Sequence, residues 1–263
     1  MTEDLNTPML HMRLPSRGSK ILRRITMKIE PNNIYNANCI DVLDEMIRDR
    51  QKVQFILTDP PYGINYIPHF NDFGGIQADD FTDENHVKLI YDYFERCYQV
   101  LENDKFLVSF MGWSTIPTFN DALTKAGFTI KSMPIWYKNV WGIGYYTRPQ
   151  YEPMYLCIKG KPKPPQAAIS DVIKADKVVD LIHSCQKPIN LLSILINTFS
   201  QPDDVVFDGF GGSFSTCVAA RKCGRQYISC ELDKKLFKIG EKNLEQEINQ
   251  TTLFELHLKG RRQ

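Results

Sequence analysis

The stretch Val53-Gln-Phe-Ile-Leu-Thr58 leads directly into Asp59-Pro60-Pro61-Tyr62. Its first six residues form a largely apolar run of strand length, which is typical of a strand covered on both faces of a parallel sheet. Two successive prolines then end the strand, because each fixes its backbone and lacks an N–H group. The stretch therefore predicts a buried strand that displays a carboxylate, a rigid carbonyl and an aromatic ring at its carboxyl end.

Strands and helices alternate on both sides of this run. The pattern predicts an α/β fold with a doubly wound, mostly parallel sheet. Two of the expected strands follow one another without a helix between them, which predicts an antiparallel pair at one edge of the sheet. The expected strands are 34–39, 53–58, 106–111, 130–137, 151–158, 205–208 and 226–231, and the expected helices are 41–50, 83–101, 119–126, 188–199, 215–222 and 234–248.

A second motif lies near the carboxyl terminus, where Val205-Val-Phe-Asp208 is followed by Gly-Phe-Gly-Gly-Ser-Phe-Ser-Thr216. Glycines let backbone amides approach an anionic or zwitterionic ligand, and a helix N-terminus favours a carboxylate. The next strand ends at Glu231, an acid that can accept both hydroxyls of a ribose. The turn lacks the P-loop and dinucleotide patterns. A tight strand-to-helix turn without a ligand is the alternative.

The tetrad at Asp59–Tyr62 suits one chemical task. An exocyclic amine of a nucleobase is a poor nucleophile, because its lone pair is delocalised into the ring. The Asp59 carboxylate and the Pro60 carbonyl could accept its two hydrogens, while Tyr62 stacks on a base that has left the double helix. The alternative is a simple strand-terminating turn, since Asp-Pro is common in turns.

Taken together, these residues resemble the amino-group DNA methyltransferases, in the circularly permuted motif order called the beta class, of the DPPY type. The tetrad at 59–62 comes first, and the glycine-rich loop at 208–216 comes near the end. Between them, His183-Ser-Cys-Gln-Lys-Pro188 resembles the HPTQKP element, and the segment 34–39 resembles the strand that contacts the cofactor's adenine. The resemblance covers about residues 30 to 247.

The resemblance implies the Rossmann-like fold of S-adenosylmethionine-dependent methyltransferases, S-adenosylmethionine as cofactor and double-stranded DNA as partner. It also assigns residues to roles. The implied catalytic residues are Asp59, Pro60, Pro61 and Tyr62. The implied cofactor residues are Asn38 for the adenine, Lys187, Asp208, Phe210, Gly211, Gly212, Ser213 and Ser215 for the methionine part, and Glu231 for the ribose.

The implied target is the amino group of adenine, because Asp at the first tetrad position is the form mostly associated with adenine. Methylation of the cytosine amino group and of adenine in RNA are the alternatives. The sequence departs from the family pattern at Gly209, where proline is usual, at Phe214, where a small residue is usual, at Asn38, where aspartate is common, and at Ser184-Cys185. A DNA-binding protein that has lost catalysis is therefore a third alternative.

The domain organisation follows from the same pattern. Residues 27–250 are expected to form a single methyltransferase domain, with a flexible basic tail at 1–26 and a second tail at 251–263. The span 159–182 is a short candidate for DNA contact, in which Lys159, Lys161 and Lys163 would meet phosphates; a solvated basic loop is the alternative. Because this span is short, a homodimer could share the DNA.

The segment Gln250-Thr-Thr-Leu-Phe254 resembles the peptides that bind bacterial sliding clamps, although a tail packed on the domain is the alternative. The 263 residues carry a net charge of +1, which neither requires nor excludes a nucleic-acid partner. No apolar run is long enough to cross a bilayer. The seven cysteines and five histidines form no metal-binding pattern, so we expect a reduced, cytoplasmic protein without a metal.

Overall fold

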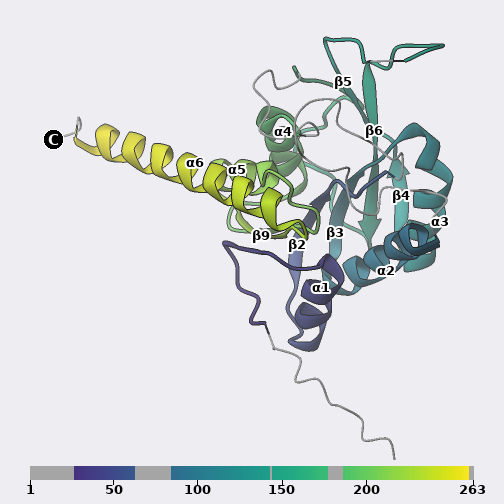
Figure 1. Ribbon diagram of the computed structural model, residues 1–263, viewed down its shortest axis with the longest axis horizontal. Helices are drawn as coiled ribbons and strands as arrows, with labels where there is room; N and C mark the ends of the chain where they lie inside the picture. The colour runs from purple at the N-terminus through teal and green to yellow at the C-terminus, as the bar shows by residue number, and fades with distance from the viewer. Residues whose placement is uncertain (1–26, 63–83, 143, 177–185, 261–263) are drawn as a thin grey trace, which may run out of the picture.

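The computed structural model describes residues 27–62, 84–142, 144–176 and 186–260, with side chains described as far as residue 249. Within these residues a single sheet has the strand order β1-β9-β8-β2-β3-β6-β5-β7, and β4 also pairs with β6 (Figure 1). The strands are β1 (Asn33–Tyr35), β2 (Val53–Thr58), β3 (Leu101–Phe110), β4 (Thr129–Ser132), β5 (Ile135–Tyr137), β6 (Tyr151–Lys159), β7 (Val172–Lys174), β8 (Val205–Asp208) and β9 (Gln226–Cys230).

Helices cover both faces of the sheet (Figure 1). One core cluster joins the sheet to α1 (Cys39–Arg48), α2 (Glu84–Val100) and α3 (Ile116–Ala126). The other joins it to α4 (Ile189–Phe199), α5 (Ser215–Lys222) and α6 (Lys234–Gly260). The expected doubly wound α/β fold is therefore confirmed, as is the burial of the strand at 53–58, in which every residue except the half-buried Gln54 is buried.

The predicted antiparallel pair at one edge of the sheet is confirmed, since both β4 and β5 pair antiparallel with β6. Strand β6 lies between β3 and β5 and is antiparallel to both, so it is an interior strand. The edge is formed by β7, which the sequence did not reveal within the expected loop at 159–182. The single strand expected at 130–137 is divided into β4 and β5, with Pro134 between them removing a donor from the ladder.

Element ends differ at two other places. Strand β3 begins at Leu101, directly after α2, rather than at residue 106. Helix α6 continues to Gly260 rather than ending at 248, so the expected domain boundary at 250 falls inside a helix that extends away from the sheet (Figure 1). The segment 250–254 is part of this helix, and its clamp-binding role stays a prediction. The tail at 1–26 lies outside the described residues.

The carboxyl ends of the parallel strands meet at one edge of the sheet. Strand β2 pairs with β8 on one side and with β3 on the other. Strand β8 pairs with β9, which pairs with β1. Neighbouring strands lie about 4.8 Å apart, so the residues that follow β2, β8 and β9 are brought together. These residues include Asp59, Gly209 and Glu231.

Position 209 carries glycine where the family that the sequence resembles usually has proline. A side chain on α2 packs directly against this glycine. Tyr93 is fully buried there, and its hydroxyl lies 2.8 Å from the Thr58 Oγ1 and accepts the Gly209 N–H at 3.3 Å. A Cβ atom on residue 209 would lie 2.4 Å from the Tyr93 ring. Glycine is therefore required at this position by the ring that packs against it.

Phe214, the second departure, packs inward rather than toward the edge of the sheet. Its backbone is left-handed, with φ of 56°, at the N-cap of α5. Its ring is fully buried, lies edge to face with Phe237 at 5.6 Å, and fills the space beside Gly211 and Gly240. The left-handed conformation costs about 1–2 kcal/mol. Burial of the ring contributes about 1.5–3 kcal/mol and outweighs that cost.

A double-mutant cycle tests the match between Gly209 and Tyr93. Gly209→Ala is expected to lower the free energy of unfolding by about 1–3 kcal/mol, because the new methyl group overlaps the buried ring. In a Tyr93→Leu background the same change should cost well under 1 kcal/mol. Urea denaturation of the four proteins measures both costs. Equal costs in the two backgrounds would show that the ring does not set the requirement for glycine.

Candidate functional site

The residues after β2 form a compact polar group at the carboxyl edge of the sheet. The Tyr62 hydroxyl donates to the Asp59 Oδ1 at 2.5 Å. Pro60 is buried, whereas Pro61 and Tyr62 are half-buried. The Tyr62 ring packs against the core cluster that contains α4 and α5. The tetrad therefore presents its carboxylate and its phenol to the same small volume.

Lys187 lies within this group. Its side chain is only 8% exposed, and its ammonium group pairs with the Asp59 Oδ2 and lies 3.4 Å from the Tyr62 hydroxyl. The ammonium also lies 4.9 Å from the centre of the Phe110 ring. The sequence assigned Lys187 to the methionine part of the cofactor, and these contacts bring it to the predicted catalytic carboxylate. Gln186 to Pro188 are described, whereas 183–185 of the HPTQKP-like element lie outside the described residues.

Glu152 on β6 is a member of the group that sequence reasoning missed. Its Oε2 lies 3.3 Å from the Lys187 ammonium, and its Oε1 pairs with Lys138. Burial alone would raise the pKa of Glu152, but the charges of Lys187 and Lys138 outweigh burial and hold the pKa below its ordinary value. An acid that precedes a proline inside a strand carried no signal of this role. Its partners become visible only once the pairing of β6 is known.

The glycine-rich turn after β8 holds a buried carboxylate. Asp208 accepts the Phe210 N–H at 3.1 Å. Burial raises the pKa of Asp208 to about 6, although the Thr216 hydroxyl and the Phe210 N–H oppose that rise. The neighbouring Ser213 and Ser215 hydroxyls lie 2.8 Å apart and are also buried. The turn therefore collects the hydrogen-bonding groups that a zwitterionic ligand requires.

Glu231 joins the end of β9 to the same turn. Its Oε2 accepts the Gly212 N–H at 2.9 Å, and its Oε1 accepts the Asp233 N–H at 2.8 Å. Burial raises the pKa of Glu231 above its ordinary value. Gly212 has φ of 51°, and no atom lies within 4 Å of the position that a Cβ would take. The open space beside an acid and backbone amides fits the ribose and methionine parts of a nucleoside cofactor.

Asn38 lies beside this acid but also has a local structural task. Its Oδ1 accepts the Ile40 N–H at 2.9 Å and caps α1. The adjacent Asn36 side chain donates to the Glu231 main-chain oxygen at 2.8 Å, which ties the two segments together. The ring of Phe210, another predicted cofactor residue, lies edge to face with the Tyr93 ring, with 4.8 Å between the two ring centres. The Asn38 oxygen stabilises the start of α1, and the role of Asn38 at the cofactor's adenine stays a prediction.

The two predicted motifs come together because β2 and β8 are neighbours. Asp59 is near enough to Asp208 for its charge to contribute to the raised pKa of that carboxyl. On the other side of β8, Glu231 contacts Gly212 across the turn. The predicted catalytic and cofactor residues thus share one edge of the sheet, although they are separated by more than a hundred residues in the chain.

The lysines predicted to contact DNA lie toward the opposite end of β6 from the predicted catalytic residues, and their contact with DNA stays a prediction. In the antiparallel ladder, Lys159 of β6 lies opposite Lys105, toward the amino end of β3. Met154, five residues earlier on β6, lies opposite Phe110 beside the site. Five residues of strand span about 17 Å. The Lys159 ammonium donates to the main-chain oxygens of Tyr98 and Leu101, both at 2.7 Å. Lys161 and Lys163 continue from this opposite edge, in the loop that follows β6.

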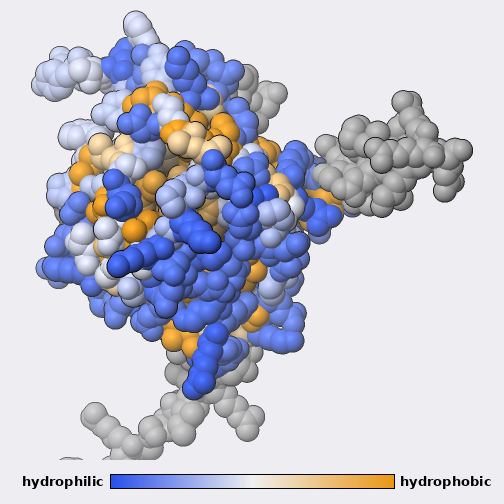
Figure 2. Space-filling model, turned by 180° about the vertical axis from the view of Figure 1, so that it is seen from behind, coloured by the Kyte–Doolittle hydropathy of each residue, from blue (hydrophilic) through white to orange (hydrophobic). Residues whose placement is uncertain are grey.

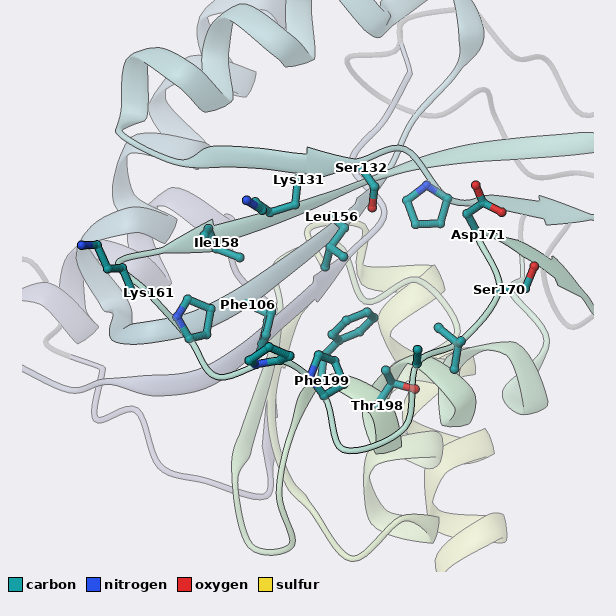
Figure 3. Close-up of a pocket in the computed structure, with 16 residues that line it drawn as sticks. Phe106, Lys131, Ser132, Leu156, Ile158, Lys161, Ser170, Asp171, Thr198 and Phe199 are labelled. Atoms are coloured by element: carbon teal, nitrogen blue, oxygen red, sulfur yellow. The ribbon is translucent and has the colours of Figure 1, made fainter.

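A cavity of about 530 Å³ is formed elsewhere, between β6, α4 and the loop that follows β6 (Figure 3). It is lined by Phe199, Phe106 and Leu156 on one side and by the proline-rich loop from Lys161 on the other. None of the predicted catalytic or cofactor residues lines it. Figure 2 shows that the molecule seen from behind is mostly hydrophilic, with apolar residues gathered in the upper half of that face.

Two absences can be stated for the described part of the chain. No group of three or more histidine, cysteine, aspartate or glutamate side chains there could hold a metal ion. None of the described helices combines the length and the apolar character that a membrane crossing requires.

Comparison with known proteins gives consistent results. A family model described as DNA methylase matches residues 53–242. The YubD protein of Escherichia coli (strain K12) is 36% identical over 192 residues, which are 73% of this chain and 82% of YubD. The DNA adenine methyltransferase YhdJ of the same organism is 24% identical over 233 residues, covering 74% of this chain and 77% of YhdJ.

Solved structures share the fold. The chain is similar to the M1.HpyAVI–SAM complex, with a TM-score of 0.65, 24% identity and coverage of 81% of this chain and 98% of that chain. It is also similar to PvuII DNA methyltransferase, described as cytosine-N4-specific, with a TM-score of 0.61, 13% identity and coverage of 82% and 94%. These likenesses confirm the expected methyltransferase fold.

The buried Asp208 carboxylate predicts a pH-dependent stability. Because its pKa is raised from 3.8 to about 6 in the folded protein, protonation favours folding, and this contribution is lost as the pH rises through 6. Asp208→Asn should therefore raise the free energy of unfolding above pH 6, by at most about 3 kcal/mol. The difference from wild type should vanish below about pH 4. Thermal unfolding between pH 4 and 8 measures it, and a difference independent of pH would contradict the assignment.

The pairing of Glu152 with two lysines predicts a loss of stability on neutralisation. Glu152→Gln should lower the free energy of unfolding by about 1–3 kcal/mol, less than for a fully buried pair because the side chain is partly exposed. The matched control is Glu245→Gln, an exposed acid on α6, which should change little. Urea denaturation measures the free energy of unfolding of both variants. If Glu152→Gln changes it as little as Glu245→Gln does, Glu152 has no structural role.

Proposed function

Because the chain belongs to the DNA methylase family, we propose that it transfers a methyl group to the amino group of adenine in double-stranded DNA. Members of the family use S-adenosylmethionine as the methyl donor. The observation that carries the proposal is the shared edge of the sheet, where Asp59 and Tyr62 lie on the strand next to the turn that Glu231 contacts. The proposal places the chain in the permuted, DPPY-type subclass.

The cofactor would be held at the glycine-rich turn. The Asp208 carboxylate and the neighbouring serine hydroxyls suit its methionine part, and Glu231 suits the two ribose hydroxyls. The Glu231 carboxylate now accepts two backbone N–H groups. Each carboxylate oxygen has a second lone pair, so a ribose can be accepted without breaking those bonds. When bound, the cofactor supplies an electrophilic methyl group on a sulfonium centre.

The Asp59 carboxylate and the Pro60 carbonyl would accept the two hydrogens of the target amine. With both hydrogens held, the nitrogen becomes pyramidal and its lone pair is free to form the new N–C bond. The C–S bond of the donor would break at the same time, so that its sulfur leaves as a neutral thioether, and the nitrogen would then release its extra proton to water. No separate general base is required for the attack. Tyr62 would stack on the extruded base.

Lys187 and Tyr62 hold the Asp59 carboxylate before the base arrives. Each oxygen of that carboxylate has one partner, since Oδ1 accepts from Tyr62 and Oδ2 pairs with Lys187. Glu152 shares the Lys187 ammonium and thereby fixes its position. The target amine would take a further lone pair of Asp59. In this arrangement Lys187 positions the catalytic carboxylate, in addition to any contact that it makes with the cofactor.

Adenine is the favoured base, and the cytosine amino group is the alternative. Aspartate at the first tetrad position supports adenine, as does similarity to YhdJ, which is described as a DNA adenine methyltransferase. The fold does not discriminate, since the cytosine-N4-specific PvuII enzyme shares it. RNA as substrate is disfavoured by the same aspartate. A catalytically silent protein is disfavoured because Gly209 is matched to Tyr93 and Phe214 packs inward.

Two substitutions separate catalysis from cofactor binding. Asp59→Ala should lower the rate of methyl transfer by about 10²- to 10⁴-fold, because the amine loses its charged acceptor, and should leave cofactor affinity nearly unchanged. Glu231→Ala should weaken cofactor affinity instead, because the ribose hydroxyls lose their acceptor. Transfer of a radiolabelled methyl group to plasmid DNA measures the first effect, and calorimetry with S-adenosylmethionine measures the second.

Asp49→Ala is the control, since Asp49 is an exposed acid at the end of α1. Mass analysis of the digested nucleosides identifies the methylated base. Detection of N6-methyladenine supports the proposal, whereas N4-methylcytosine would show that the cytosine amino group is the target instead. Full activity of Asp59→Ala would remove the catalytic assignment.

A further inference from the structure

The connection between β5 and β6, residues 138–150, presents three aromatic side chains to solvent. Trp141 is 61% exposed, Tyr145 95% and Tyr146 94%. We call these three residues the aromatic tip. The connection projects from the top of the molecule in Figure 1, and the same projection is seen from behind in Figure 2. Large aromatic side chains gathered on a projecting surface are typical of an interaction site.

The projecting connection has a defined shape. The Gly142 N–H donates to the Pro149 oxygen at 2.8 Å, and the Arg148 Nε donates to the Gly142 oxygen at 3.0 Å. The Arg148 guanidinium also lies 5.2 Å from the centre of the Trp141 ring. Tyr145 and Tyr146 lie edge to face, 5.1 Å apart. Local bonds therefore shape the base of the connection around Trp141, while Tyr145 and Tyr146 project into solvent, where a partner can reach them.

The chemistry of the connection favours a polyanion with stacked bases. Residues 138–150 include Lys138 and Arg148 and contain no acidic residue. Cationic side chains meet phosphates, and aromatic rings stack on bases irrespective of their sequence. Lys138 is already paired with Glu152, so the exposed Arg148 is the cation that can meet a phosphate. A nucleic acid satisfies both properties, whereas an apolar protein surface would leave the Arg148 charge without an anionic partner.

The connection rises from the same edge of the sheet as the proposed catalytic residues. At its base, Lys138 pairs with Glu152, and Glu152 contacts Lys187. Lys187 in turn pairs with Asp59. The first residue after β3, Met111, donates its N–H to the Pro153 oxygen at 3.1 Å, which fixes β6 against that edge. DNA that delivers a base to Asp59 would therefore lie close to the aromatic tip.

We propose that the aromatic tip inserts into the DNA duplex beside the target and stacks in the space that the extruded base leaves. This inference rests on the proposed function and assigns a partner surface on the side of the sheet that carries the predicted catalytic residues. A base inside a duplex cannot reach the catalytic carboxylate unless it is unstacked. Apolar and aromatic wedges are a general means of holding such an opening.

The test compares Tyr145→Ala/Tyr146→Ala with Tyr145→Phe/Tyr146→Phe. Both pairs of changes are at fully exposed positions, and the second keeps the rings while removing the hydroxyls. The substrates are two duplexes that contain the recognition sequence, found beforehand by modified-base sequencing of plasmid DNA. One has the normal partner opposite the target, and the other has an abasic site there, so that its target base is already unpaired.

The alanine pair should lower kcat/KM on the normal duplex by about 10- to 100-fold, the range that stacking on one base is worth. On the abasic duplex the loss should be less than about threefold, since less opening work remains. The phenylalanine pair should resemble wild type on both duplexes. Affinity for S-adenosylmethionine should be unchanged in all variants, as calorimetry can show.

Three outcomes would overturn the inference while leaving the proposed function in place. They are an unchanged kcat/KM for the alanine pair, an equal loss on both duplexes, and a change of oligomeric state on gel filtration, which would assign the tip to a second copy of the chain. A wild-type protein that methylates no DNA at all would remove the proposed function first and this inference with it.

Discussion

The arrangement of the site depends on the ion pairs that the buried ammonium group of Lys187 makes. It lies between the carboxylates of Asp59, after β2, and Glu152, on β6. Without the positive charge, two acids on separate strands would face one another in a partly buried space, where repulsion is poorly screened. The ion pairs therefore join the segment before α4, the proposed catalytic tetrad and the base of the β5–β6 connection into one unit.

The same edge of the sheet carries features that do not favour folding. Burial raises the pKa of Asp208 and of Glu231, which means that their charged forms are held at a cost. Phe214 adds a left-handed backbone at a non-glycine residue. These costs fall at the turn proposed to hold the cofactor, while β8 and β9 beneath it are buried except at their first residues. Such a distribution is expected where a binding site is stabilised by the rest of the fold.

The sequence predicted the residues whose role follows from their place at a strand end. Asp59, Asp208 and Glu231 each follow or close a buried apolar run, so the general rule for parallel sheets brings them together. Glu152 and Lys159 could not be placed in this way, because both lie on β6 and only the antiparallel register decides which end of that strand meets the site. The departures at Gly209 and Phe214 likewise required knowledge of Tyr93 and Phe237, whose rings meet them only through the packing of α2 and α6.

The charged residues at the two ends of β6 differ in what surrounds them. At its first end, Glu152 pairs with Lys138, the first residue of the exposed β5–β6 connection, which contains no acidic residue. At its last end, the Lys159 ammonium is bound by main-chain oxygens of α2 and β3. In the proposed complex with DNA, the exposed Arg148 and the rings of the aromatic tip would therefore make the contacts at the first end of β6. For a chain of net charge +1, such affinity would come from a few well-placed cations and rings, because the overall field supplies almost no attraction.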